Sequence, residues 1–389
     1  MMRISLARIA GLRVRSVSGL LLLSAFAFTG CSLYPSGGSG PAPDLRVAQV
    51  TDLGPILLNP KVVGRDGGYS GVFAGYSIWV FGDTFLASPN AEGETLISDS
   101  WAFTADLSAS GGITGFQERQ DSSGAPAMLL QLTAAEQAFN TAHQGNPCQE
   151  EPCGARWALW PGAVVDDPAR HRALVFYQLV SAQPGNFDFH AVGYSVAIWQ
   201  DFASLPERPL INPAAAHPDL LFGPSDPGFG SSAFALGDEL YAYACYSSDF
   251  SVPCVLGRAP LGNVLDLGSW TFYRGNGNWS SRIGDASFLF AGNPILNVSW
   301  NSYLERYVAV YNSPLSVHVL MRTAPAPEGP WSREVHVFDA VSSSGSVDDA
   351  QAHPEYNLDG GQTMFLTYSQ PTSTLGSQFR LVAVRLERP

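Results

Sequence analysis

The sequence has few charged residues and almost no lysine. Charged residues make up 14% of the 389 residues, against about 25% in an ordinary soluble protein. Lys61 is the only lysine, and the formal net charge is −13. So little charge excludes a disordered chain or a coiled coil, and the acidic excess disfavours binding to nucleic-acid phosphates or anionic lipid. We therefore expect a packed globular protein that binds a neutral or cationic ligand and no nucleic acid.

Long helical patterns are also missing. Beyond residue 45 the chain has no extended 3.6-residue periodicity, apart from a short helical segment predicted near 133–139. Glycine (39 residues), proline (28) and aromatic residues (12%) are plentiful instead. This balance is typical of tight turns that join aromatic-rich β-strands, so the fold is predicted to be mostly β.

The first 30 residues have the pattern of a secretory signal peptide. Arginines precede an apolar run from Gly19 to Phe28, which is too short and wrongly flanked for a transmembrane helix. No later segment is apolar for the roughly 20 residues that a membrane helix requires. Residues 1–30 are therefore predicted to direct export and to be removed.

The segment after this run predicts a lipid anchor. Thr29-Gly30-Cys31 resembles the lipobox of bacterial lipoproteins, in which the cysteine becomes the lipidated N-terminus. Residues 31–44 are rich in Gly, Ser and Pro and are expected to form a flexible tether, with the folded domain over 45–389. The predicted location is the outer membrane or cell surface, and plain secretion is the alternative.

Four cysteines remain after Cys31. An even number of closely spaced cysteines in an exported protein predicts disulfides, and we expect the pairs Cys148–Cys153 and Cys245–Cys254. A zinc site is the competing interpretation, but neither pair has the spacing of two residues that is typical of structural zinc sites.

One pattern occurs five times along the chain. An inner strand with small residues is followed by a turn, a strongly apolar strand and a more polar outer strand. Repetition at intervals of about 60 to 70 residues predicts a five-bladed β-propeller, with a β-sandwich as the alternative. The apolar strands are predicted at 77–83, 172–177, 240–244, 307–311 and 363–368.

Two aspartates flank the first hairpin. If the chain turns at Gly75-Tyr76, Asp83 lies opposite Gly68, about two residues from Asp66. Two carboxylates at one end of a hairpin suit glycoside hydrolysis, in which one protonates the leaving oxygen while the other attacks or activates water. The alternative is that both aspartates only cap turns.

Other residues of the inner strands are secondary candidates. Glu355 is a third candidate catalytic acid, with His353 on the same face of its strand, although the two could equally form a structural pair. Aromatic residues stack on sugar rings but more often belong to the core, and hydroxyl or amide groups bind sugar hydroxyls. The candidate substrate-binding residues are Tyr69, Trp160, Ser231, Asn293, Asn297 and His353.

Several of these segments resemble one known family. Gly64-Arg65-Asp66-Gly67-Gly68-Tyr69-Ser70 and Ile78-Trp79-Val80-Phe81-Gly82-Asp83-Thr84-Phe85 resemble the opening of the domain-of-unknown-function family DUF4185, part of which is classed as glycoside hydrolase family 183, the endo-D-arabinanases. Segments 301–311, 321–331 and 353–355 are also similar, and the resemblance spans about 45–389. It implies a five-bladed propeller acting on furanoside polymers, with Asp66 and Asp83 as the catalytic pair. The insertion at 121–154 departs from the family pattern.

The functional hypothesis is an exported glycoside hydrolase. Its expected substrate is arabinan of mycobacterial-type cell-wall glycans, and we expect no cofactor, no metal ion and a monomer. The alternative is a carbohydrate-binding surface lipoprotein without catalysis. The two differ at the central pocket, because only the enzyme requires a pair of carboxylates there.

Overall fold

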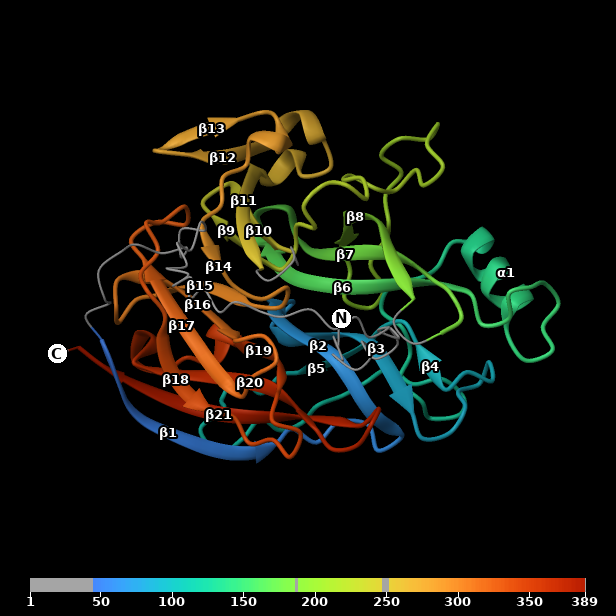
Figure 1. Ribbon diagram of the computed structural model, residues 1–389, viewed down its shortest axis with the longest axis horizontal. Coiled ribbons are helices and arrows are strands. Elements are labelled where there is room, and N and C mark those ends of the chain that lie inside the picture. The colour runs from blue at the N-terminus through green and yellow to red at the C-terminus, as the bar shows by residue number, and fades with distance from the viewer. Residues whose placement is uncertain (1–44, 186–187, 247–251, 389) are drawn as a thin grey trace, which may run out of the picture.

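The computed structural model describes residues 45–185, 188–246 and 252–388. These residues form five antiparallel sheets that follow one another around a common centre (Figure 1). The prediction of an all-β, five-bladed propeller is confirmed. The signal peptide, the tether and the lipidated Cys31 that we predicted lie outside the described residues.

The strands follow the blades in sequence order. The first sheet contains β2 (Val62–Phe73), β3 (Tyr76–Leu86), β4 (Leu96–Ile97) and β5 (Ser100–Thr104). The second contains β6 (Arg156–Asp167), β7 (Arg172–Ala182) and β8 (Phe189–Trp199). The third contains β9 (Ser232–Leu236), β10 (Glu239–Cys245), β11 (Pro253–Pro260), β12 (Thr271–Gly275), β13 (Asn278–Ser280) and β14 (Phe290–Ala291).

The last two sheets complete the ring. The fourth contains β15 (Asn297–Asn301), β16 (Arg306–Asn312), β17 (His318–Ala324) and β18 (Val335–Asp339). The fifth contains β19 (Asp348–Ala352), β20 (Thr363–Pro371), β21 (Ser377–Glu387) and β1 (Arg46–Pro55). The predicted apolar strands are the middle strands β3, β7, β10, β16 and β20.

The ring is closed by pairing between the two ends of the described chain. Strand β1 is antiparallel to β21, from Arg46 opposite Glu387 to Pro55 opposite Arg380. Figure 1 shows this pairing as a blue strand beside a red one. Strand β1, which precedes the first blade, thus forms the outermost strand of the last blade, and its backbone hydrogen bonds to β21 close the ring.

The core lies between neighbouring blades. In β3, Ile78 and Val80 pack toward the second blade, whereas Trp79 and Phe81 pack toward the fifth. Successive side chains of a strand point to opposite faces, so a strand buried on both faces requires an unbroken apolar run. The run Ile78-Trp79-Val80-Phe81 meets this requirement, and each of its residues is at most 1% exposed.

Among the described residues the only α-helix is α1 (Ala134–His143), within the insertion. Thr133 and Glu136 form a capping box at its start, which confirms the short helix predicted there. Arg208 binds the Glu136 carboxylate at 2.7 Å and attaches the helix to the second blade. Across the described residues, no helix combines the length and the apolar character needed to span a membrane.

Candidate active site

The inner ends of the first three blades enclose a cavity of about 360 Å³. A second cavity of about 830 Å³ adjoins it and shares Asp66, Asp83 and Phe189 as lining residues. The two aspartates therefore lie where the two cavities meet. Other residues that line the first cavity are Tyr69, Trp160, Tyr194, Phe229, Ser231 and Tyr246.

The β2–β3 hairpin brings the two aspartates together. The chain turns at Ala74 and Gly75, both with positive φ (51° and 82°), and not at Gly75-Tyr76 as the sequence suggested. The actual turn therefore brings Asp66 and Asp83 closer to direct pairing than the sequence analysis suggested. Arg65 pairs with Thr84 and Gly67 pairs with Phe81, so the single residue Asp66 faces both Gly82 and Asp83 across a β-bulge.

Glycines make this local geometry feasible. Gly67 and Gly68 have φ of 95° and 84°, a region that glycine enters without strain. A Cβ on Gly68 would lie 2.5 Å from the ring of Phe379, so a side chain there would displace the fifth blade. The motif of two glycines after Asp66 thus allows both the bulge and the close packing behind it.

Asp83 is held by two donors from the second blade. Arg156 Nη2 donates to Oδ1 at 3.0 Å and to Oδ2 at 3.2 Å, and Trp160 Nε1 donates to Oδ1 at 3.0 Å. The Arg156 and Asp83 side chains are 22% and 17% exposed, so water reaches both. These donors fix the orientation of the carboxylate and stabilise its negative charge.

A buried carboxyl group lies behind Asp83. Asp99, between β4 and β5, is fully buried and accepts hydrogen bonds from the backbone N–H groups of Leu129 (2.6 Å) and Leu130 (3.2 Å). Burial, with a smaller contribution from the negative charge of Asp83, raises the pKa of Asp99 to about 7. An additional negative charge behind Asp83 is therefore unfavourable at neutral pH.

Asp66 has a buried carboxyl group beside it in the fifth blade. Asp349 Oδ2 accepts a hydrogen bond from the Gly67 backbone N–H at 3.0 Å, and Gln351 Nε2 donates to the Gly67 carbonyl at 3.1 Å. Side chains of β19 thus bind both the backbone N–H and the backbone carbonyl of Gly67, the residue that follows Asp66. Burial, and then the negative charge of Asp66, raise the pKa of Asp349 well above its usual range.

Three of the predicted substrate-binding residues line the first cavity. Tyr69 donates its hydroxyl to the Pro294 carbonyl at 3.4 Å, and burial, followed by the charge of Asp349, raises its pKa. The Trp160 ring packs edge to face against Phe189, with ring centroids 4.8 Å apart. In this orientation its indole N–H donates to Asp83. Ser231 Oγ accepts a hydrogen bond from the Cys245 N–H at 3.0 Å.

Glu355 and His353 line neither cavity. His353 is fully buried, stacks on Trp79 at 4.2 Å, and contacts Ser70 Oγ (2.6 Å) and Thr367 Oγ1 (2.7 Å) through its two ring nitrogens. Burial lowers the pKa of His353 to about 3, so the ring is neutral. Glu355 accepts a hydrogen bond from Ser77 Oγ at 2.9 Å, and burial raises its pKa. The prediction that they share one face of a strand was wrong, because β19 ends at Ala352 and Pro354–Tyr356 form a 3-10 turn; both residues lie in the interface between the first and fifth blades.

The two predicted asparagines also lie outside the cavity lining. Asn293 holds its own turn, because Nδ2 donates to the Asn312 carbonyl at 3.0 Å and Oδ1 accepts from the Ile295 N–H at 3.2 Å. Its neighbour Pro294 lines the cavity instead. Asn297 begins β15, where it pairs with Val310 of β16.

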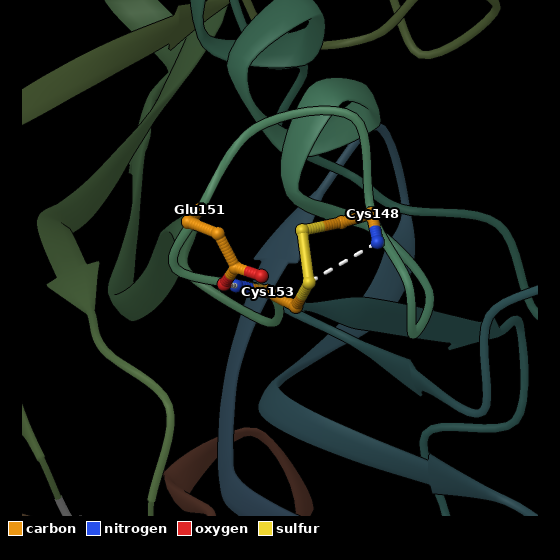
Figure 2. A group of neighbouring side chains, drawn as sticks. All are labelled: Cys148, Glu151 and Cys153. Carbon is orange, nitrogen blue, oxygen red and sulfur yellow. Dashed lines mark hydrogen bonds between the residues drawn. A yellow bond between two sulfur atoms is a disulfide. The ribbon is translucent and has the colours of Figure 1, made fainter.

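Both predicted disulfides are confirmed: Cys148–Cys153 and Cys245–Cys254. The zinc interpretation does not fit, because each sulfur is bonded to another sulfur. Figure 2 shows the first bridge, in which the Cys148 N–H also donates to Cys153 Sγ at 3.1 Å. Glu151 accepts a hydrogen bond from the Cys153 N–H at 3.0 Å. Gly154, directly after this bridge, lines the second cavity, and so the insertion contributes to the site.

Arg156 and Asp349 are site residues that the sequence analysis missed. Arg156 directly precedes the segment Trp157-Ala158-Leu159-Trp160, and a cation at the start of this aromatic segment is a signal that could have identified it. Asp349 follows a serine-rich loop, and no local pattern distinguishes it from a turn residue.

Solved structures share the fold at low sequence identity. A "putative hydrolase" from Bacteroides ovatus ATCC 8483 is 14% identical, with a TM-score of 0.53, and the match covers 82% of this chain and 85% of that one. Zg3597, a family 117 glycoside hydrolase from Zobellia galactanivorans, is 10% identical with a TM-score of 0.48, covering 87% and 90%. A GH43_1 enzyme from Xanthomonas citri is 12% identical with a TM-score of 0.47, covering 86% and 90%.

Sequence comparison identifies the family. No curated protein matches the chain. The model of the domain of unknown function DUF4185 matches residues 49–373, which is most of the propeller and includes both aspartates. The chain therefore belongs to the DUF4185 family.

Proposed function

We propose that the protein is a glycoside hydrolase that cleaves within a furanoside polysaccharide. The observation that carries this proposal is the bulge at which Asp66 faces Asp83, with both residues lining two adjoining cavities. Glycoside hydrolysis requires a pair of carboxyl groups across the scissile bond. A pocket for carbohydrate binding alone does not require them.

The surroundings of the two aspartates suggest different roles. Asp83 accepts hydrogen bonds from Arg156 and Trp160, which stabilise a carboxylate that attacks the anomeric carbon or activates a water molecule. Asp66 lines the cavity beside the buried Asp349, whose pKa is raised by burial and then by the negative charge of Asp66. With Asp83 held as the carboxylate, Asp66 is assigned as the acid that protonates the leaving oxygen as the glycosidic bond breaks.

The two cavities suit a polymeric substrate. They meet at the aspartates, so sugar units can occupy both sides of the cleavage point, as internal cleavage requires. Trp160, Phe189, Tyr194 and Phe229 supply aromatic faces for sugar rings. The resemblance to glycoside hydrolase family 183 supports D-arabinan of mycobacterial-type cell walls as the substrate.

The test is release of oligosaccharides from D-arabinan, with L-arabinan and arabinogalactan in parallel. Wild type, Asp66→Asn and Asp83→Asn are compared with Asp201→Asn, an exposed aspartate that lines neither cavity. We expect internal cleavage by wild type and Asp201→Asn, and a loss of about 10³-fold or more in each of the other two variants. Glycan binding without cleavage by a folded wild-type protein would instead favour the surface carbohydrate-binding alternative.

We also propose that the protein is exported and anchored by lipid on Cys31 to the outer membrane or cell surface. The apolar run before Thr29-Gly30-Cys31 supports this. Two disulfides agree with an oxidising compartment. Labelling with an alkyne fatty acid should mark the wild type and not Cys31→Ser. A labelled Cys31→Ser variant would contradict the proposed anchor.

A further inference from the structure

Two histidines and one aspartate converge on the outer face of the fourth blade. His318 Nδ1 lies 2.6 Å from Asp339 Oδ1, and His336 Nε2 lies 2.7 Å from the same oxygen. The two imidazole rings are 5.4 Å apart at an angle of 78°. The three ligand atoms all lie within 4.8 Å of one another.

A β-bulge places the three side chains on one face. His318 and Asp339 are opposite each other on the antiparallel strands β17 and β18. His336 and Asp339 are three positions apart, so in a regular strand they would point to opposite faces. The register shifts between Val319 paired with Phe338 and Leu320 paired with His336, and this irregularity returns His336 to the face of Asp339.

The face is open to solvent. The side chains of His318, His336 and Asp339 are 53%, 53% and 58% exposed. The neighbouring Val319 and Val337 point inward and belong to the core between the fourth and fifth blades. The core therefore fixes the two strands, while the three polar side chains remain free to adjust.

We propose that His318, His336 and Asp339 bind a divalent transition-metal ion, with Zn²⁺ as the best match. Two imidazole nitrogens and one carboxylate oxygen suit zinc, whereas Ca²⁺ and Mg²⁺ prefer oxygen ligands. Ligands at about 2.0–2.1 Å from a tetrahedral zinc lie roughly 3.3 Å apart. The present separations of 2.6 and 2.7 Å thus require only a small outward adjustment of exposed side chains. Water completes the coordination.

Such an ion would join the outermost strand of the blade to its neighbour. Among the strands of the described residues, β18 pairs only with β17, and the bulge interrupts that pairing. Metal ligands from both strands would cross-link them at the end where β18 leads into the segment before β19. The site is separate from the proposed active site, because none of its residues lines either cavity.

The experiment is isothermal titration of the purified full chain, stripped of metal, with ZnCl₂. A matched exposed histidine, His190 in β8, provides the control. We expect one saturable equivalent of Zn²⁺ in wild type and His190→Ala, and affinity at least about tenfold weaker in His318→Ala, His336→Ala and Asp339→Asn. Co²⁺ should give a visible absorption band only in the first two proteins.

Thermal unfolding provides an independent readout. Zn²⁺ should raise the unfolding midpoint of wild type and His190→Ala, but not that of the three ligand variants, because only a bound native state is stabilised. Absence of saturable Zn²⁺ binding to wild type would overturn the proposal. Equal affinity in wild type and the ligand variants would also overturn it, by placing the ion elsewhere.

Discussion

Oδ2 of Asp349 accepts a hydrogen bond from the Gly67 backbone N–H at 3.0 Å, across 282 residues of sequence. A buried carboxyl group of the fifth blade is thereby fixed beside Asp66 of the first blade. The two groups influence each other, since the negative charge of Asp66 contributes to the raised pKa of Asp349. In the proposed reaction, Asp349 is a positioning residue that acts through Asp66.

Replacing Asp349 by asparagine should separate its effect on activity from its effect on stability. Asparagine retains an acceptor for Gly67 and tolerates the φ of 60° at this position. Asparagine cannot ionise, so any part of the activity profile that reports the ionisation of Asp349 beside Asp66 should disappear in the variant. We expect kcat near neutral pH to fall about 10- to 100-fold, measured as arabinan cleavage between pH 4 and 9.

Whereas the activity of Asp349→Asn should fall, its stability at high pH should rise. Because the pKa of Asp349 is raised in the folded state, its favourable contribution is present at low pH and is lost as the pH rises through the folded pKa. The variant should therefore be more stable than wild type at pH 8 and similar at pH 4, as denaturant unfolding would show. An unchanged activity profile together with lower stability at pH 8 would contradict both expectations.

Asp99 should make the fold sensitive to alkali. Its pKa of about 7 lies above the usual value of 3.8, so its contribution is present below about pH 4 and is lost as the pH rises through 7. Asp99→Asn retains an acceptor for Leu129 and Leu130, and it should be more stable than wild type by up to about 4 kcal/mol at pH 8. Chemical denaturation at pH 4 and pH 8 measures this difference. Equal gains at both pH values would show that charge is not the cause.

Arg156 should contribute to turnover through Asp83. Arg156→Gln removes the charge that faces both carboxylate oxygens, and we expect kcat/KM for arabinan to fall by about 100-fold, equivalent to roughly 2.7 kcal/mol. Arg156→Lys, which retains the charge without the planar guanidinium, should recover part of the loss. Trp160→Phe keeps an aromatic face and removes only the indole N–H, so its loss should be smaller.

Steady-state kinetics of the three variants and their thermal unfolding midpoints distinguish catalysis from folding. The side chains of Arg156 and Asp83 are partly exposed, so the midpoint should change little in Arg156→Lys. Full activity in Arg156→Gln would contradict a role for this ion pair in the reaction.

His353 should stabilise the fold without affecting substrate binding. Replacing it by alanine removes the stack on Trp79 and leaves Ser70 and Thr367 without their ring partner. We expect a loss of about 2–4 kcal/mol in unfolding free energy and an unchanged KM for arabinan at low temperature. A raised KM with unchanged stability would instead support a direct contact with substrate.

The same residue should cause instability in acid. Because burial lowers the pKa of His353 to about 3 in the folded state, its contribution is present above about pH 6.5 and is lost as the pH falls toward 3. The stability gap between wild type and His353→Ala should therefore narrow below pH 5. Denaturant unfolding at pH 7, 5 and 4 tests this trend.

Local chemistry made part of the site predictable. Asp66 and Asp83 belong to one hairpin, and glycines after Asp66 indicated an unusual backbone there. The exact turn was misplaced, since Ala74 gave no sign that it adopts positive φ. The disulfide between Cys245 and Cys254 was likewise predictable from the short spacing of the two cysteines, which lie opposite each other on adjacent strands of one blade.

The sequence by itself determined the five repeated strands, because a strand buried between two blades requires an unbroken apolar run such as Ile78-Trp79-Val80-Phe81. Only the tertiary structure decided which polar groups meet at the centre. Arg156 reaches Asp83 from the second blade, and Asp349 reaches Gly67 from the fifth. His353 is instead enclosed by Trp79 and Thr367. The physical reason is that ring closure brings together the inner ends of blades that are far apart in sequence, so their contacts depend on blade packing and leave no local pattern.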